Sequence, residues 1–173
     1  PGISASVLTQ RLEGLEAGGV LRRVALPDPA DMHVYELTKL GEAVRPVIDA
    51  LCRVGARLPG HDPSKFISPS ALMLSMVAMI DRKAAREEQI SAGFDLGRES
   101  FRGALVRGQW RPERGPAEGD LVFQGSPNAL ARVIYGKAPF RHWLGSHVVT
   151  LRGDPDAGQR FVDLFAIRRG QVT

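Results

Sequence analysis

The stretch ISASVLTQRLEGLEAGGVLRR (residues 3–23) decides the predicted fold of the N-terminal part of the chain. Ser4 has the side chain of a helix N-cap, and Gly18 and Gly19 end the helix, because glycine adopts the left-handed C-terminal conformation at little cost. The apolar side chains between them share one arc of the helix and are Val7, Leu8, Leu12 and Leu15. The opposite, polar face carries Ser6, Thr9, Gln10 and Glu13.

Two strands and a longer helix are predicted after this helix. VLRRVAL (residues 20–26) and HVYEL (residues 33–37) have the composition of strands, and PDPADM between them is typical of a turn. Thr38 then begins a helix that extends to about Arg57 and contains Pro46, which removes one backbone hydrogen bond. Helix, glycine stop, hairpin and helix together predict the second half of a winged helix-turn-helix.

The longer helix carries an apolar stripe about 120° wide, which a two-stranded hairpin is too small to cover. A second copy of the same helix is the expected cover, so the sequence predicts a homodimer. The stripe, taken as the dimerisation surface, consists of Leu40, Val44, Val47, Ile48, Leu51, Val54 and Leu58.

The rest of the chain predicts a second domain of a different class. Residues 59–68 have the composition of a linker, so the expected domains are 1–58, with the dimerisation helix, and 69–173. A capping residue followed by proline begins a helix at each of Ser68, Ser126 and Asp154. Alternating stretches between these helices, ISAGFDL, SFRGALV, GQWRP, DLVFQG and HVVTLRG, predict an α+β domain with a five-stranded antiparallel sheet covered by helices.

Composition excludes several classes of protein. No apolar stretch approaches the ~18 residues that a membrane helix needs, so no membrane partner is expected. Cys52 is the only cysteine, which excludes an internal disulfide and favours the cytoplasm. The net charge of +4 lies within residues 61–173, whereas residues 1–60 hold seven Lys and Arg against seven Asp and Glu. Bulk charge therefore does not mark the DNA-binding part of the chain.

The sequence shows no pattern for catalysis or metal binding. The four histidines have no metal-ligand spacing, and neither a glycine-rich phosphate loop nor a serine nucleophile elbow is present. We therefore expect no enzymatic activity, no metal and no cofactor.

The N-terminal third resembles the HxlR family of bacterial winged-helix transcription regulators. The resemblance rests on GISASVLTQRLEGLEAGGVLRR and on VYELTKLGEAVRPVIDAL, and it covers residues 3–57. It implies binding to double-stranded operator DNA through the helix that begins after Ser4. It also implies that two helices precede this recognition helix, so the sequence is expected to begin in the turn of a helix-turn-helix.

The predicted DNA contacts come from the recognition helix and the first strand. Hydroxyl and amide groups suit base edges in the major groove, and arginines suit phosphates. Arg22 and Arg23 alternate on their strand, so only one faces the DNA, and the choice stays open. Arg11 lies toward the apolar arc, and packing of its stem on the hairpin is the alternative to DNA contact. The candidates are Ser4, Ser6, Thr9, Gln10, Arg11, Arg22 and Arg23.

The C-terminal part, residues 68–167, resembles a sterol-carrier-protein-type domain. The resemblance rests on DLVFQGSPNALARVIYGK and VVTLRGDPDAGQRFVDLF. It implies an apolar cavity between sheet and helices and hence a hydrophobic small-molecule ligand. A filled core that serves dimerisation alone is the alternative. The candidate lining residues are Met73, Met76, Phe94, Trp110, Phe123, Trp143, Phe161 and Phe165.

Two functions from different classes follow. The first is a homodimeric DNA-binding transcription regulator, either constitutive or responsive to a hydrophobic ligand. The second is a lipid or small-molecule carrier whose N-terminal part serves only dimerisation. Salt-dependent binding to DNA separates them.

Overall fold

The computed structural model describes residues 2–26, 32–56, 58, 65–136, 138–144 and 148–165 of the 173-residue chain. The chain divides into two compact units, Pro1–Ile48 and Asp49–Thr173. The boundary between them falls inside the helix α2 (Lys39–Gly55). Residues 27–31 of the predicted turn PDPADM and residues 59–64 of the predicted linker lie outside the described residues.

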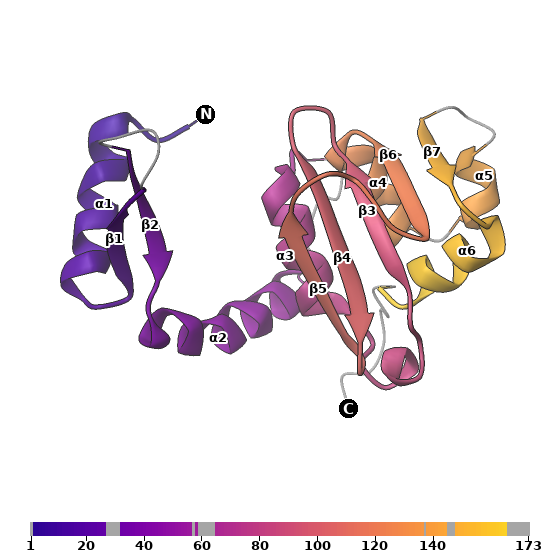
Figure 1. Ribbon diagram of the computed structural model, residues 1–173, viewed down its shortest axis with the longest axis horizontal. Helices are drawn as coiled ribbons and strands as arrows, with labels where there is room; N and C mark the ends of the chain where they lie inside the picture. The colour runs from indigo at the N-terminus through magenta and orange to yellow at the C-terminus, as the bar shows by residue number, and fades with distance from the viewer. Residues whose placement is uncertain are drawn as a thin grey trace. The chain divides into compact units, whose positions relative to one another are not determined.

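The first unit contains α1 (Ala5–Ala17), the hairpin of β1 (Leu21–Ala25) and β2 (His33–Leu37), and the start of α2 (Figure 1). The hydroxyl of Ser4 accepts a hydrogen bond from the Val7 backbone N at 3.3 Å, and Gly19 adopts a φ of 71° beyond the end of α1. This left-handed φ is the conformation that glycine favours. The predicted cap, helix, glycine stop and hairpin are confirmed.

Thr38 joins the hairpin to α2 through its side chain. Its hydroxyl donates to the Gly19 carbonyl, and the Gly41 backbone N donates to the Thr38 hydroxyl at 3.2 Å. Thr38 is therefore the predicted cap of α2, because its oxygen satisfies a free donor in the first turn. The helix continues through Pro46 and ends at Gly55. Arg57, the predicted end, lies outside the described residues.

The second unit combines the end of α2 with a layer of helices and one sheet. Its further helices are α3 (Pro69–Met79), the 3-10 turn η1 (Ala84–Arg86), α4 (Pro127–Tyr135), α5 (Phe140–Leu144) and α6 (Pro155–Asp163). Its strands are β3 (Ser91–Asp95), β4 (Ser100–Val106), β5 (Gln109–Arg114), β6 (Leu121–Gly125) and β7 (Val149–Arg152). The side chains of Ser68, Ser126 and Asp154 cap α3, α4 and α6, as predicted.

The sheet has five strands in the order β5-β4-β3-β6-β7, but it is mixed. The prediction of an antiparallel sheet was wrong for one pair, because β3 and β6 run parallel with Ala92 opposite Leu121. The connection from β5 to β6 crosses the sheet instead of turning back beside β5. Gly93 lies under this crossing, where a Cβ atom would be 2.5 Å from the Glu118 backbone N. Only glycine leaves room for so close an approach.

The core of the second unit lies between one face of the sheet and the helices (Figure 1). Phe94 of β3, Trp110 of β5 and Phe123 of β6 project into it, and each is at most 2% exposed. No polar or charged side chain is buried among the described residues. The unit is therefore held by burial of apolar area, at about 25 cal/mol per Å².

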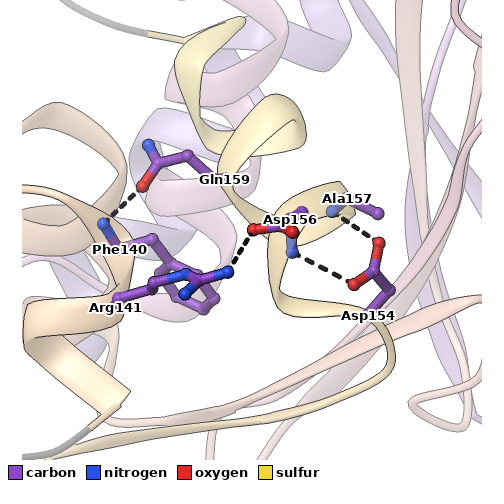
Figure 2. Close-up of polar contacts among 6 residues, drawn as sticks. All are labelled: Phe140, Arg141, Asp154, Asp156, Ala157 and Gln159. Carbon is purple, nitrogen blue, oxygen red and sulfur yellow. Dashed lines mark hydrogen bonds and ion pairs between the residues drawn. The ribbon is translucent and has the colours of Figure 1, made fainter.

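Polar contacts join α5 to α6 at the edge of this core (Figure 2). The Gln159 side-chain oxygen accepts from the Phe140 backbone N at 2.6 Å, and Arg141 pairs with Asp156 at 2.6 Å. Asp154 accepts from the first backbone N–H groups of α6 at 3.1 and 3.2 Å. These contacts hold the short α5 in place, and the ring of Phe140 is fully buried.

Within the described part of the chain, no helix has the length and apolar composition required to cross a lipid bilayer.

Candidate nucleic-acid interface

The helix α1 exposes almost its whole surface in the first unit. None of its residues is buried, and only Leu12 is half-buried. The apolar arc is exposed at Val7 (38%), Leu8 (46%) and Leu15 (44%). Burial thus does not distinguish the two faces of α1, which differ in composition alone. The predicted DNA-contacting residues on and before this helix are all exposed and are Ser4, Ser6, Thr9, Gln10 and Arg11.

The start of α1 suits a phosphate group. The Ser4 hydroxyl caps the helix and lies 3.0 Å from the Ser6 hydroxyl, so both are held at the helix terminus. The first turn contains no acidic residue that would compete for the backbone N–H groups. The partial positive charge at this end of the helix therefore faces solvent without a neighbouring carboxylate in the first turn.

Thr9 and Gln10 follow one turn later and present free polar groups. Within the described part of the chain, neither side chain forms a hydrogen bond, and both are exposed. Arg11 is likewise exposed and forms no ion pair with a described carboxylate. An exposed amide and hydroxyl can each donate to and accept from base edges.

The hairpin places the two arginines of β1 in different surroundings. Arg22 lies directly opposite Glu36 of β2, and its guanidinium contacts that carboxylate at 2.8 and 3.2 Å. Arg23 lies opposite Tyr35, and its backbone N donates to the Glu16 carboxylate of α1 at 3.2 Å. The Arg23 side chain is exposed and has no ion pair among the described residues. Arg23 is therefore the arginine whose charge is available to a phosphate.

Sequence reasoning missed Glu36 as the partner of Arg22. The signal was the hairpin itself, because opposite charges at equal distances from the turn become cross-strand neighbours once the register is known. This exposed ion pair contributes about 0–1 kcal/mol, so its main effect is to balance the charge of Arg22.

Net charge does not favour DNA binding by the first unit. Residues 1–48 hold five Lys and Arg against six Asp and Glu, which gives a net charge of −1. Attraction to DNA therefore depends on where single cations lie rather than on the overall field of this unit.

The predicted dimerisation stripe is exposed along α2. Val44 is half-buried, and the exposed fractions of the other stripe residues are 54% for Leu40, 57% for Val47, 47% for Ile48, 61% for Leu51, 58% for Val54 and 57% for Leu58. A row of apolar side chains that stay about half exposed is a candidate surface for contact with another apolar surface.

The predicted ligand-pocket residues come together in the second unit. Met73, Met76, Phe94, Trp110, Phe123, Phe161 and Phe165 are at most 3% exposed and belong to one core cluster, and Trp143 is half-buried against it. The Phe161 ring centroid lies 5.3 Å from that of Trp110, 5.6 Å from Phe123 and 5.0 Å from Phe165. The indole N–H of Trp110 is buried and finds no acceptor among the described residues.

The described residues offer no site for a metal ion: no group of three His, Cys, Asp or Glu side chains among them converges.

The helix α1, its glycine stop and the β1–β2 wing have the arrangement of the second half of a winged helix-turn-helix, a class of DNA-binding module. Residues 1–62 match the family described as HxlR-like helix-turn-helix. An uncharacterized HTH-type transcriptional regulator of Methanothermobacter thermautotrophicus is 36% identical over 61 residues, which are 35% of this chain and 47% of the relative. The chain thus spans about half the length of the curated relatives it matches.

Solved structures that are similar to this chain cover more than half of its length. The sec-alkylsulfatase Pisa1 from Pseudomonas sp. has a TM-score of 0.52 at 14% identity, covering 58% of this chain and 16% of that one. A crystal structure of sterol carrier protein 2 has a TM-score of 0.39 at 19% identity, covering 58% of this chain and 92% of that one. Identities this low concern the fold alone. The family match over residues 1–62 agrees with the resemblance stated for the N-terminal third of the chain.

Proposed function

We propose that this chain acts in a homodimeric transcription regulator of the HxlR type that binds double-stranded operator DNA. The proposal rests on two sets of exposed side chains that have no partner among the described residues. They are Thr9 and Gln10 on α1 and Arg23 on the wing. The first supplies base contacts and the second a phosphate contact. The family match over residues 1–62 supports the same conclusion.

The dimer follows from the stripe on α2. One recognition helix covers one half-site, so two copies related by a two-fold axis bind a two-fold operator whose half-sites lie about 34–36 Å apart. The exposed fractions of 47–61% along the stripe support a second copy as its cover.

The second unit holds a hydrophobic ligand in this proposal. The apolar interior supports burial as the binding force, and the unpaired Trp110 N–H supports a ligand with one hydrogen-bond acceptor, since a buried donor without a partner costs about 1–3 kcal/mol. The close ring packing supports the alternative, a filled core. Such a ligand regulates DNA binding only to the extent that its affinity differs between two dimer geometries.

Replacing Gln10 or Thr9 with alanine in the full-length protein is expected to relax sequence preference. Loss of one good base contact costs about 1–3 kcal/mol on the preferred operator and little on unrelated DNA. Fluorescence anisotropy measures the affinity for the gene's own promoter region and the affinity for a scrambled duplex. Gln109→Ala, on β5 of the second unit, is the matched control and should leave both affinities unchanged. Equal losses on the two duplexes would contradict base readout by α1.

Arg23→Ala is expected to weaken binding to every DNA sequence. Because one fewer counterion is released on binding, the slope of log affinity against log salt concentration should become shallower by about 0.9. Titration of affinity against salt concentration gives that slope. The double change Arg22→Ala and Glu36→Ala removes a balanced pair and serves as the control, with the slope expected to stay unchanged. A slope that falls in the control but not in Arg23→Ala would assign the phosphate contact to Arg22.

A further inference from the structure

The last two turns of α2 belong to the second unit, which begins at Asp49, and they have two unlike faces. The half-buried side chains from there onward follow the i, i+3, i+4, i+7 spacing of one helix face. These residues, which we call the docked face, are Asp49, Cys52, Arg53 and Ala56. Leu51 and Val54 lie on the other side and are 61% and 58% exposed. The docked face therefore lies opposite the second half of the stripe.

Arg53 makes a polar contact between the docked face and α3. Its guanidinium donates to the Ala78 carbonyl at 3.0 Å, in the last turn of α3 (Figure 1). Ala78 is 3% exposed, and carbonyls in the last turn of a helix have no donor within that helix. Among the described residues, Arg53 has no ion pair with a carboxylate. The cation therefore satisfies a buried carbonyl at the negative end of the α3 dipole.

The docked face also lies near α4. Burial raises the pKa of the Tyr135 hydroxyl of α4, and the Cys52 thiol contributes to the same shift. The Tyr135 hydroxyl lies 2.6 Å from the Ser75 hydroxyl of α3. Two consecutive residues of α2, Cys52 and Arg53, thus lie near two helices of the unit that are hydrogen-bonded to each other.

The end of α3 is joined to the apolar core of the unit. The Ile80 backbone N donates to the Met76 carbonyl at 3.1 Å, and the Asp81 backbone N donates to the Leu164 carbonyl, just beyond α6, at 2.7 Å. Met76 is fully buried and Leu164 is 7% exposed. The carbonyl that Arg53 contacts is therefore part of a segment whose position is set by core packing.

The second half of the stripe depends on the docked face for its helical conformation. Pro46 removes one backbone hydrogen bond from α2, so the turns beyond it are less well supported by the turns before it. Two turns of helix are marginal by themselves in water, and tertiary packing supplies most of their stability. Leu51 and Val54 therefore stay on one face of a helix because the opposite face is held by the unit.

We infer that Arg53 is the positioning residue through which the α+β unit holds the second half of the dimerisation stripe. The inference rests on the proposed homodimer and adds a route by which the second unit regulates it. Arg53 lies outside the stripe, so its effect on dimerisation passes through Leu51 and Val54. A displacement of the end of α3 then changes dimer affinity and, with it, affinity for the full operator.

Sedimentation equilibrium and fluorescence anisotropy of the full-length protein test the inference with Arg53→Ala. The change leaves the Ala78 carbonyl without its donor, so the dimer dissociation constant is expected to rise at least tenfold and affinity for the full operator to fall with it. Affinity for a duplex with one half-site should stay within twofold, because α1 and the wing are unchanged. Loss of the fold would instead lower both affinities, and circular dichroism checks for it.

Two further variants serve as controls. Arg53→Lys keeps a cation that can donate to the Ala78 carbonyl, and its dimer dissociation constant should stay within threefold of the unchanged protein. Arg45→Ala removes an exposed arginine of the same helix, paired with Glu42 at 3.1 Å, and should change the constant less than twofold. Hydrogen exchange at the backbone N–H groups of residues 53–56 should be at least tenfold faster in Arg53→Ala and unchanged in Arg45→Ala.

Leu51→Asp in the same series separates the inference from the proposed dimer. Monomers in Leu51→Asp together with an unchanged constant in Arg53→Ala would overturn the inference and leave the dimer standing. If neither variant changes the oligomeric state, the homodimer and the inference both fail. An effect of Arg53→Ala that persists equally in Arg53→Lys would also overturn the inference, because the hydrogen bond to Ala78 would then not be its cause.

Discussion

Replacing Leu51 with aspartate is expected to convert the dimer into monomers and to abolish specific operator binding. Leu51 lies in the second half of the stripe and is 61% exposed in the single chain. In a two-fold interface the substitution buries two carboxylates, one from each copy, and unpaired or like charges there cost several kcal/mol. We expect the dimer dissociation constant to rise at least a thousandfold, about 4 kcal/mol.

Sedimentation velocity gives the oligomeric state, and anisotropy with the full operator gives the affinity. Leu51→Met is the matched control, because it preserves volume and hydrophobicity and should cost less than about 1.5 kcal/mol. A monomeric Leu51→Asp protein that still binds the full operator as tightly as the unchanged protein would remove the basis for the two-fold model.

Truncating Phe161 to alanine is expected to lower the free energy of unfolding by about 3–5 kcal/mol. The ring is fully buried, and its neighbours Trp110, Phe123 and Phe165 lie at centroid distances of 5.0–5.6 Å. Urea unfolding followed by tryptophan fluorescence measures the loss. Val106→Ala, an exposed position, should change stability by less than about 0.5 kcal/mol. A loss below about 1 kcal/mol in Phe161→Ala would mean that the ring has few packed neighbours.

The same unfolding measurement on the unchanged protein tests the ligand proposal. A ligand that binds only the folded unit stabilises it by about 2.7 kcal/mol at a concentration of 100 Kd. Dodecanoate and a sterol are the probes, and a saturable change in the emission of Trp110 and Trp143 is the expected companion signal. Absence of both effects would leave the second unit a filled core that serves dimerisation.

Most helix starts and the wing were predictable because local contacts set them. A capping hydroxyl or carboxylate reaches a backbone N–H two or three residues ahead, as Ser4, Ser126 and Asp154 do. Such interactions depend on near neighbours in the chain, so the residue types and their spacing are sufficient to place them. For the same reason the polar residues of α1 and the apolar stripe of α2 were identified as surfaces from periodicity alone.

What tertiary structure decided involves residues far apart in the sequence. The parallel pairing of β3 with β6 required the chain to cross the sheet at Gly93, and no local signal specifies where a strand inserts. Glu36 pairs with Arg22 because the hairpin register places them opposite each other. The aromatic residues of the second unit were recognised as interior from their type, but their close ring contacts depend on how side-chain volumes fill a shared space. Periodicity reports which face of an element is apolar, and only packing determines what that face meets.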